Sequence, residues 1–568
     1  MPDLLADYTA QSEQLMPFYA RAAQAVLAPP YPDGRMSAAL ADEINQYQQR
    51  LGGEGTLQGD ELFILTGQQP GLFTGPLYTV YKAATAILLA ARAERATGRR
   101  CVPVFWVASD DHDFEEVREA HFLTRRHDRL TLRYTPEETL ALALGEIPMH
   151  RVPATPQIHQ FIDLARKFCP GSELAAQVAE GLHDAANEAE SVSDWFARLM
   201  ARLFAGTPLH LFSPDLPGAR RAAAPVFQHE AAEPLASTRL LNETGKALEA
   251  LGYPAQVVKG GRQCNFFLEV NGKRRTVWFQ NGRFMVPRET AQFSPDEMQA
   301  LADTAPERFS ANVALRCVVQ QALFPGTLAY VAGPGELAYW AQLKRFFTHF
   351  GQPMPVVYPR ARAVVIAQKE RQLLDRFGLS AGQMDAPRDV LEERAARAVA
   401  ANPAIALVHQ ERSTLEHELA SLAERLADSR GANETARQAA LGIRDHLARG
   451  FDRLERHLLH NDTEKYSAAA RQVDRLCTAL APERKPQERV YCVYSFIFAE
   501  GGAIINNVLD QLYITSFALN EVRLSAMKPR NTRWTCWRWA PIRTTPNWVS
   551  AASCASWRSA VSAWASST

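Results

Sequence analysis

The residues with the clearest chemical potential form a run of acids around one histidine. This run directly follows the apolar segment 102–108 and comprises Asp110, Asp111, His112, Asp113, Glu115 and Glu116. Carboxylates bind ammonium groups and sugar hydroxyls, and a histidine transfers protons near neutral pH. We predict that His112 is the acid–base group, that Asp110 and Asp113 orient it, and that the other acids are less directly involved. The same acids could bind a divalent cation or simply cap the next helix.

A glycine-rich turn follows the apolar run 62–66. Its candidate substrate-binding residues are Thr66, Gly67, Gln68, Gln69, Gly71, Thr74 and Gly75. Glycines let backbone N–H groups approach a ligand, and the N-terminus of the following helix favours an anion such as phosphate or carboxylate. The turn has no GxxxxGK[ST] pattern and is therefore not a P-loop. A tight strand–helix turn that needs glycine for its backbone alone would look the same.

A second turn repeats this order of strand, glycines and helix start. Its candidate substrate-binding residues are Gly333, Gly335, Glu336, Tyr339 and Trp340. We predict close backbone approach at the glycines, an amine held by Glu336, and a pocket walled by the two aromatic rings. For Trp340, packing in the core is an equal alternative.

For several other residues we first expect an ordinary role, as a surface charge or as a packing residue. Four cations could neutralise an anion, although a solvated surface charge is the ordinary role of each: Lys82, Lys344, Arg360 and Arg362. Cys101, Cys264 and Cys317 lie in or near predicted strands and have no neighbouring partners for a nucleophile. We expect them to be buried packing residues rather than catalytic thiols.

The elements that must position these residues form a parallel sheet. Two apolar strands, 62–66 and 102–108, flank a helix at 77–92, which is the pattern of a right-handed βαβ unit. Further strands are predicted at 208–212, 327–333 and 354–358. Because ligands bind at the carboxyl ends of parallel strands, the three polar clusters are predicted to converge at one edge of the sheet.

Two other regions have different patterns. Residues 253–290 alternate around Asn271-Gly272 and Asn281-Gly282, which predicts an antiparallel ribbon. Beyond about residue 365, leucines at 415, 419, 422 and 426 form a heptad stripe, and a second stripe runs from Ile443 to Leu458. Two antiparallel helices joined by a turn at 430–435 are predicted, either as a dimerising coiled coil or within an ordinary helical bundle.

Composition limits the class of protein. The chain has 568 residues, enough for two or three domains, and its 62 basic and 62 acidic residues give no net charge, which argues against a nucleic-acid partner. No apolar run is long enough to span a membrane, and the N-terminus lacks a signal-peptide pattern. The eight cysteines include no CxxC pair, so no metal site is predicted. We expect a cytoplasmic protein.

Long motifs give the chain a resemblance to a known family. The segments TGQQPGLFTGPLYTVYK (66–82), PVFWVASDDHDFEE (103–116), FSANVALRCVVQQALFPGTLAYVAGPGELAYWAQL (309–343) and MPVVYPR (354–360), with the weaker PQERVY (486–491), resemble the cysteine-adding enzymes of bacillithiol biosynthesis. The resemblance implies an α/β fold with a Rossmann-like core related to nucleotidyl transferases and class I aminoacyl-tRNA synthetases. It also implies inserted connecting segments and a C-terminal coiled coil that forms a homodimer.

The resemblance also implies a reaction, in which the carboxylate of L-cysteine forms an amide with the amine of glucosaminyl-malate. The related folds suggest ATP with magnesium as the activating cofactor, but the chain lacks the HIGH and KMSKS signatures of those relatives, so the cofactor stays open. Two alternatives also stay open. One is a related nucleotidyl- or acyl-transferring enzyme acting on another sugar amine, and the other is a non-catalytic scaffold for pathway partners.

These patterns give a domain plan. It has the first half of the core at 1–125, a helical connecting insertion at 126–205, the second half of the core at 206–362, a helical coiled-coil domain at 363–482, and a return segment at 483–524.

The remaining segment, 525–568, holds six of the ten tryptophans and no acid. If the reading frame is shifted by one base, the possible codons of this segment can encode an amino-acid sequence similar to the start of sugar N-deacetylases. We therefore expect that the segment is an out-of-frame tail; a natural disordered tail is the alternative.

Overall fold

The computed structural model describes residues 3–135, 145–399, 403–428, 434–461 and 463–524. Two compact units make up the chain. The core unit runs up to Val364 and resumes at Glu488, and the helical unit spans residues 365–487. The predicted tail at 525–568 lies outside the described residues.

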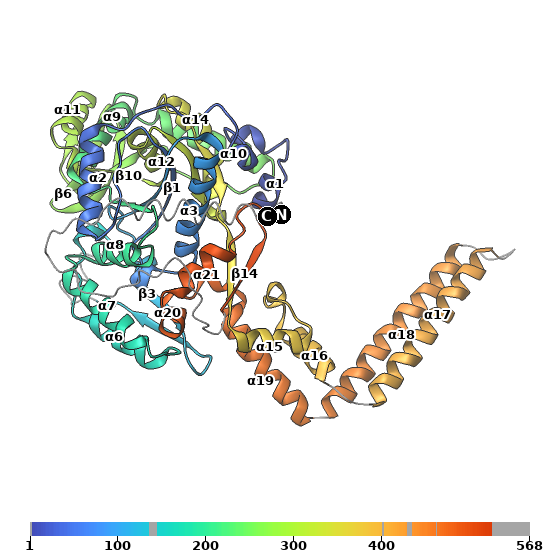
Figure 1. The fold of residues 1–568 in the computed structure, drawn as a ribbon. Coiled ribbons are helices and arrows are strands. Elements are labelled where there is room, and N and C mark those ends of the chain that lie inside the picture. The colour runs from blue at the N-terminus through green and yellow to red at the C-terminus, as the bar shows by residue number, and fades with distance from the viewer. Residues whose placement is uncertain (1–2, 136–144, 400–402, 429–433, 462, 525–568) are drawn as a thin grey trace. The chain divides into compact units, whose positions relative to one another are not determined.

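The centre of the core unit is a five-stranded parallel sheet in the order β12-β11-β1-β2-β5. Figure 1 labels its middle strand, β1. Its strands are β1 (Leu62–Gln68), β2 (Cys101–Val107), β5 (His210–Phe212), β11 (Thr327–Ala332) and β12 (Val356–Pro359). Nearly every residue in them is buried, as the continuous apolar runs predict for a sheet covered on both faces. The predicted parallel sheet is therefore confirmed.

Helix α3 (Tyr78–Thr97) joins β1 to β2 and completes the predicted βαβ unit. Its many buried alanines let it pack closely on the sheet, and it ends at Gly98, whose left-handed φ of 67° caps the last turn. The other helices of this Rossmann-like part are α1 (Leu4–Thr9), α2 (Ala38–Arg50), α9 (Pro217–Ala232), α10 (Ala236–Ala250), α11 (Pro295–Thr304), α12 (Val313–Leu323), α13 (Pro334–Trp340) and α14 (Lys344–His349).

The connecting insertion begins differently from the expected helices. A short helix α4 (Phe114–Val117) leads into an antiparallel hairpin of β3 (Glu119–Leu123) and β4 (Arg129–Arg133). Helices α6 (Gln157–Phe168), α7 (Ala175–Glu188) and α8 (Val192–Leu203) then follow. The helical periodicity predicted over 156–205 is confirmed, whereas the hairpin was not foreseen.

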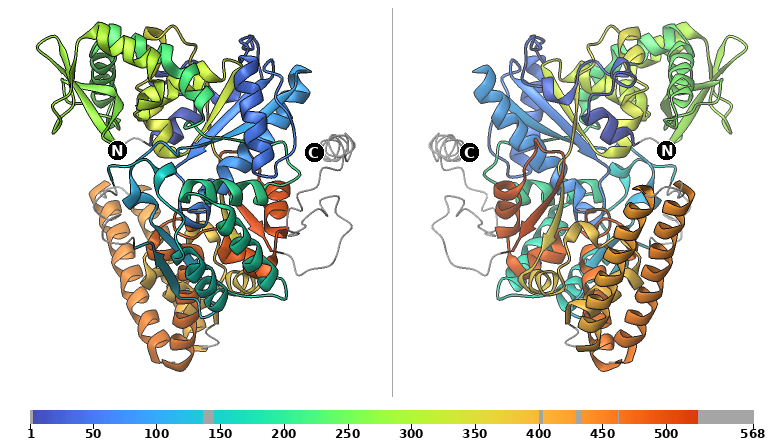
Figure 2. Two further views of the ribbon diagram at one scale, coloured as in Figure 1. Left: turned by 90° about the vertical axis from the view of Figure 1, so that its left-hand side faces the viewer. Right: turned by 90° about the vertical axis from the view of Figure 1, so that its right-hand side faces the viewer.

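A second sheet in the core unit is antiparallel, in the order β10-β6-β7-β8-β9 (Figure 2). Its strands are β6 (Gln263–Val270), β7 (Lys273–Gln280), β8 (Arg283–Met285), β9 (Gln292–Phe293) and β10 (Phe309–Ala311). Both predicted Asn-Gly turns are confirmed. Asn271 and Gly272 have φ of 53° and 75°, and Asn281 and Gly282 have φ of 54° and 73°, as a type I′ hairpin requires.

After the helical unit the chain returns to the core unit. The buried Glu488 carboxylate binds the Arg360 guanidinium at 2.6 Å and accepts from the backbone N–H of Ala363 at 3.1 Å. Helices α20 (Tyr494–Glu500) and α21 (Ala503–Gln511) follow, and β14 (Leu519–Arg523) pairs with β13 (Arg362–Ile366).

The helical unit contains α15 (Gln368–Phe377), α16 (Arg388–Val399), α17 (Pro403–Asp428), α18 (Glu434–Asn461) and α19 (Thr463–Leu480). Helices α17 and α18 lie side by side in both figures (Figures 1 and 2). Arg412 pairs with Asp452 at 2.7 Å and His409 with Glu455 at 3.2 Å, so residue numbers rise in one helix as they fall in the other. The two helices are therefore antiparallel, as predicted, and most of the expected turn lies outside the described residues.

None of the helices in the described ranges is long and apolar enough to cross a membrane.

Candidate active site

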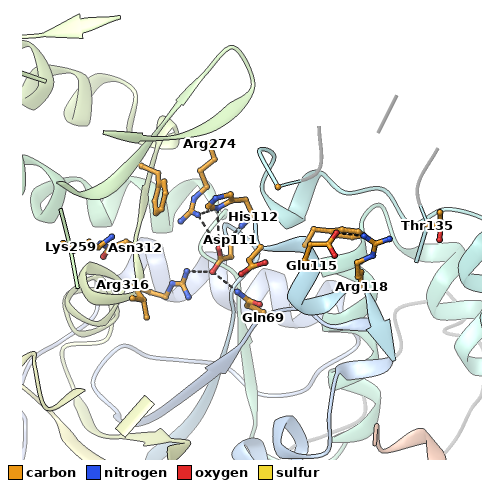
Figure 3. Close-up of a pocket in the computed structure, with 15 residues that line it drawn as sticks. Gln69, Asp111, His112, Glu115, Arg118, Thr135, Lys259, Arg274, Asn312 and Arg316 are labelled. Atoms are coloured by element: carbon orange, nitrogen blue, oxygen red, sulfur yellow. Dashed lines mark hydrogen bonds and ion pairs between the residues drawn. The ribbon is translucent and has the colours of Figure 1, made fainter. Parts of the chain in front are cut away.

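The acid run after β2 and Gln69 of the first glycine turn line a cavity of about 580 Å³ (Figure 3), whereas the second glycine turn is not among its lining residues. On the side of β1 and β2 its wall comes from Gln69, Asp111, His112 and Asp113. On the other side the wall comes from more distant segments and includes Lys259, Phe267, Arg274, Asn312 and Arg316. We call this the large cavity. Its volume lies within the range of roughly 300–1,000 Å³ typical of small-molecule sites.

Asp111 is the charge centre of the large cavity. Its two carboxylate oxygens bind Arg274 at 3.4 Å and Arg316 at 3.0 Å, and Gln69 donates to it at 3.2 Å. Burial by itself would raise the pKa of Asp111, but the two guanidinium groups hold it well below its ordinary value. Asp111 is therefore ionised and fully engaged, in contrast to the minor role predicted from the sequence.

Arg274 is fixed by contacts on several sides. From β7 its side chain donates to Ser310 Oγ at 2.8 Å and to the Ala311 carbonyl at 3.0 Å. The guanidinium lies 3.7 Å from the centre of the Phe267 ring, a cation–π contact. Burial lowers the pKa of Arg274 to about 10, so the group keeps its charge at neutral pH.

Arg316 is positioned by the start of α12. Asn312 caps this helix, and its side-chain oxygen accepts from the backbone N–H groups of Ala314 at 3.0 Å and Leu315 at 2.9 Å. Arg316 lies one turn further on, on the face that lines the large cavity. The cap therefore sets where the guanidinium meets Asp111.

His112 contacts the same arginine. The Arg274 guanidinium donates to His112 Nδ1, and because arginine has no acceptor, Nδ1 must carry the lone pair and Nε2 the proton. The ring packs edge-on against Phe267 and is 28% exposed. In this arrangement His112 presents an N–H donor through Nε2, and its predicted acid–base role stays a prediction.

Lys259 lines the large cavity from the loop between α10 and β6. Its ammonium forms no ion pair or hydrogen bond with the described residues, and burial together with the nearby Arg274 lowers its pKa. Lys259, Arg274 and Arg316 form what we call the cationic wall. Opposite it lies Glu115, which binds Arg118 (Figure 3). The wall on the side of β1 and β2 also includes Asp113, which has no ion pair within the described ranges.

Asp110, predicted to orient the histidine, is nearly buried, with 3% of its surface exposed. Its Oδ1 atom is buried without a hydrogen-bond partner among the described residues. The Oε1 atom of Gln69 is also buried and has no hydrogen-bond partner among the described residues. Buried polar atoms in this state are costly unless a ligand or water bonds to them.

The two glycine-rich turns are joined by one buried ion pair. Lys82 donates to the Gly67 carbonyl at 2.7 Å and to Gln68 Oε1 at 2.9 Å, and it binds Glu336 Oε2 at 2.5 Å. Burial lowers the pKa of Lys82, and Glu336 partly offsets this effect. The prediction that the two turns converge is confirmed.

Glu336 has little freedom to bind a substrate amine as predicted. Its carboxylate accepts from the Gly333 N–H at 2.7 Å and from the Tyr330 hydroxyl at 2.8 Å, besides pairing with Lys82. These bonds cap α13 and fix the second turn. We therefore describe Glu336 as a structural link between the turns.

Known protein families account for nearly the whole length of the described chain. Residues 2–361 match the model of "Bacillithiol biosynthesis BshC, N-terminal Rossmann-like domain", and residues 363–522 match "Bacillithiol biosynthesis BshC, C-terminal coiled-coil domain". The chain belongs to the BshC family. This confirms the resemblance and the predicted fold class, a Rossmann-like α/β core followed by a helical coiled coil.

Individual BshC proteins are similar over most of their length. The relatives from Salinibacter ruber (30% identity, 90% of this chain and 94% of that one), Koribacter versatilis (31%, 89% and 94%) and Desulforamulus reducens (29%, 84% and 88%) are each named "Putative cysteine ligase BshC". A solved structure named as a putative arginyl-tRNA synthetase from Campylobacter jejuni aligns with a TM-score of 0.22 and 10% identity over 82% of this chain and 98% of that one. That score is too low to support an argument.

The remaining candidate residues of this BshC protein have structural contacts. Thr66 donates to the Val331 carbonyl at 2.9 Å and Thr74 to the Phe73 carbonyl at 2.6 Å. Trp340 is 1% exposed and packs on Tyr330 and Phe347, as a core residue does, while Tyr339 is partly buried.

Among the remaining cations, Arg360 differs from the expected solvated surface charge, because it is 6% exposed and pairs with Glu488. Lys344 donates to the Pro17 carbonyl at 2.9 Å, and Arg360 and Arg362 lie beside Glu488. Cys101, Cys264 and Cys317 are buried thiols, as predicted, and burial raises their pKa.

The cationic wall was missed by reasoning from the sequence. Asn312 and Arg316 lie in the segment 309–343 that gave the family resemblance, and an Asn cap with a cation one turn later was a usable signal. Arg274 and Lys259 stand in a ribbon and a loop, and no local pattern distinguishes them from surface charges.

Proposed function

We propose that this BshC-family protein is a ligase that joins the carboxylate of L-cysteine to the amine of glucosaminyl-malate. The names of its relatives support the ligase activity and the cysteine substrate. The observation that supports the second substrate is the charge distribution in the large cavity, with the cationic wall on one side and carboxylates on the other. Glucosaminyl-malate carries two carboxylates at one end and an amine at the other.

The cationic wall suits the malate end. Asp111 forms ion pairs with both Arg274 and Arg316, but Lys259 has no partner within the described ranges. The cationic wall therefore keeps a net positive charge that can bind an anion. Arginine and lysine bind carboxylates through charge-assisted hydrogen bonds, which are about twice as strong as neutral ones. The malate carboxylates would lie against Lys259 and the outer edge of Arg316.

The opposite wall suits the amine. An amine attacks an acyl group only after losing a proton, and Asp113 is the carboxylate there without an ion pair in the described chain. His112 would donate a hydrogen bond from Nε2 to a substrate oxygen. In this arrangement Asp113 accepts the proton and His112 orients the substrate.

The carboxylate of cysteine must be activated before the amine can displace a leaving group. The Rossmann-like fold suggests ATP with magnesium, and Lys259 and Arg316 are suited to phosphate oxygens as well as to carboxylates. The described residues include no group of three or more His, Cys, Asp or Glu close enough to hold a metal ion. Bound ATP would supply a phosphate or adenylate leaving group.

The test is an assay of the purified full chain with L-cysteine, glucosaminyl-malate and magnesium, with and without ATP, in which bacillithiol is measured by mass spectrometry. Lys259→Met should raise the KM for glucosaminyl-malate by about tenfold or more, because a charge-assisted hydrogen bond contributes roughly 1.5–3 kcal/mol. Lys246→Met, which removes an exposed lysine on α10, is the matched control and should leave the KM unchanged.

A second substrate makes the test specific to the malate end. Glucosamine without malate should bind more weakly than glucosaminyl-malate to the wild type, and this difference should shrink in Lys259→Met. An equal difference in both proteins would place the malate elsewhere, and no bacillithiol under any condition would refute the ligase proposal.

A further inference from the structure

A smaller cavity of about 220 Å³ borders the first glycine turn. It shares Gln69 and Glu115 with the large cavity, so the two cavities have a common wall. Gly71, Gly75 and Tyr78 also line it, together with Arg489 from the returning segment. Its volume is less than half that of the large cavity, which suits a smaller ligand.

Two opposite charges in the small cavity have no ion-pair partner among the described residues. Glu116 and Arg489 both line it and are exposed, and neither forms an ion pair with any described residue. The other acids there are occupied, since Glu115 binds Arg118 and Glu119 binds Arg133 at 3.1 Å. The small cavity therefore offers one carboxylate, whose hydrogen-bond neighbour is Gln69, and one guanidinium, and both lack a counter-charge within the described ranges.

Tyr78 shows that both charges act within this space. The pKa of Tyr78 is raised to about 12, mainly by burial; the carboxylates of Glu116 and Glu336 also raise it, whereas Arg360 and Arg489 lower it. Both free charges are thus close enough to influence one hydroxyl that lines the cavity. Tyr78 is neutral at physiological pH and can donate or accept a hydrogen bond.

The common wall contains a further unsatisfied group. Gln69 donates through Nε2 to Asp111 at 3.2 Å, but its Oε1 atom is buried and accepts no hydrogen bond from the described residues. A buried acceptor in this state requires a donor from a ligand or water. An ammonium or amine group at the common wall would supply it.

We infer that the small cavity binds a free α-amino acid, with its ammonium at Glu116 and its carboxylate held by Arg489. A zwitterion of this kind carries one charged group of each sign on the same carbon atom, which matches a small cavity with one acidic and one basic side chain. The inference deepens the proposed function, on which it rests, by assigning this site to L-cysteine. The two substrates then lie in neighbouring cavities that share Gln69 and Glu115.

Binding of reduced L-cysteine to the full chain, measured by titration calorimetry with and without glucosaminyl-malate, tests the inference. Two analogues each lack one charged group: cysteamine has no carboxylate, and 3-mercaptopropionate has no ammonium. Each should bind the wild type about tenfold or more weakly than L-cysteine, because each loses one charge-assisted contact.

Two variants should give a crossed pattern. Glu116→Gln should weaken L-cysteine and cysteamine but not 3-mercaptopropionate, which has no ammonium to lose. Arg489→Met should weaken L-cysteine and 3-mercaptopropionate but not cysteamine. Glu119→Gln, which alters an acid of the same cavity that is already paired, should change none of these affinities by more than about twofold. Glu116 and Arg489 are exposed, so their replacement should not disturb the core, and circular dichroism checks that both variants are folded.

The outcomes separate this inference from the proposed function. Ligase activity with an unchanged affinity and KM for L-cysteine in both variants would overturn the amino-acid site and leave the function standing. The crossed pattern without any bacillithiol would support the site and refute the ligase. A wild-type chain that binds no L-cysteine under either condition would also overturn the inference.

Discussion

Glu230 is a buried carboxyl group connected to the large cavity through a chain of hydrogen bonds. It is 1% exposed and accepts from Ser237 Oγ at 2.6 Å and from the Asn265 N–H at 3.1 Å. The Asn265 side chain in turn accepts from Asn312 at 2.7 Å, and Asn312 lines the large cavity. A change at Glu230 can therefore reach the site through two asparagines.

Glu230 should make the core unit less stable as the pH rises. Burial raises its pKa to about 7, although the bonds from Ser237 and Asn265 and the charge of Lys259 favour the ionised form. Between about pH 4.5 and 7 the folded chain keeps a proton that the unfolded chain releases, so stability falls by on the order of 3 kcal/mol across this window. Glu230→Gln cannot ionise and should flatten this dependence.

Tryptophan fluorescence during urea unfolding at pH 5 to 8 isolates this effect, because residues 365–487 contain no tryptophan and the signal reports on the rest of the chain. Glu233→Gln, an exposed acid just after the same helix, serves as the control and should keep the wild-type slope. A slope in Glu230→Gln equal to that of the wild type would mean that Glu230 titrates normally.

Individual residues of the site were only partly predictable from the sequence. The acid run and the glycine turns stand out because their residue types cluster along the chain. Asp111 could not be ranked first among the acids, because Arg274 and Arg316 lie 163 and 205 residues away in the chain. Their approach depends on how the ribbon and α12 pack, and a local pattern does not encode that.

At the scale of elements, two glycines predicted to allow close approach to a ligand serve different needs. A Cβ at Gly67 would lie 2.7 Å from the Trp106 carbonyl oxygen and 2.9 Å from Trp106 Cβ, so β1 and β2 could not keep their spacing. A Cβ at Gly335 would have no atom within 4 Å. Gly67 is thus required by strand packing, whereas open space surrounds Gly335.

Gly67→Ala should therefore destabilise the core unit by about 1–3 kcal/mol, the usual cost of overpacking. Gly335→Ala should leave stability unchanged or raise it by up to about 1 kcal/mol, because alanine restricts the unfolded chain. Thermal unfolding compares the two variants directly. Equal destabilisation would contradict this distinction, and a raised substrate KM in a fully stable Gly335→Ala would indicate that a ligand approaches there.

The elements themselves were predicted where local chemistry specifies them. Continuous apolar runs predicted the five parallel strands, and Asn-Gly at 271–272 and 281–282 predicted two hairpins. The β3–β4 hairpin was missed because its loop has no glycine, and His127 takes the left-handed conformation instead, with φ of 62°. The residue type of His127 does not predict the left-handed conformation, which depends on the surrounding tertiary structure.

At the scale of the whole molecule, the helical unit leaves apolar side chains uncovered. Leu422 on α17 is 38% exposed, and Ile443 on α18 is 54% exposed. The ion pair between Arg412 and Asp452 sets the register of the two helices and places Leu422 level with Gly442. The side chains of Leu422 and Ile443 therefore lie at nearly the same height along the helix pair. A coiled-coil domain with this exposed stripe favours pairing with a second copy.

Replacing Leu422 and Ile443 with aspartate should convert a wild-type dimer into a monomer. In a dimer interface the new charges would be buried without partners at a cost of several kcal/mol, whereas in a single chain both positions face water and the helices should persist. Sedimentation equilibrium measures the mass, and circular dichroism checks the helices. Glu424→Lys is the control, because its side chain points about 200° around α17 from Leu422 and should leave the dimer intact. A monomeric wild type, or an aspartate variant that keeps the dimer mass, would rule out this stripe as the interface.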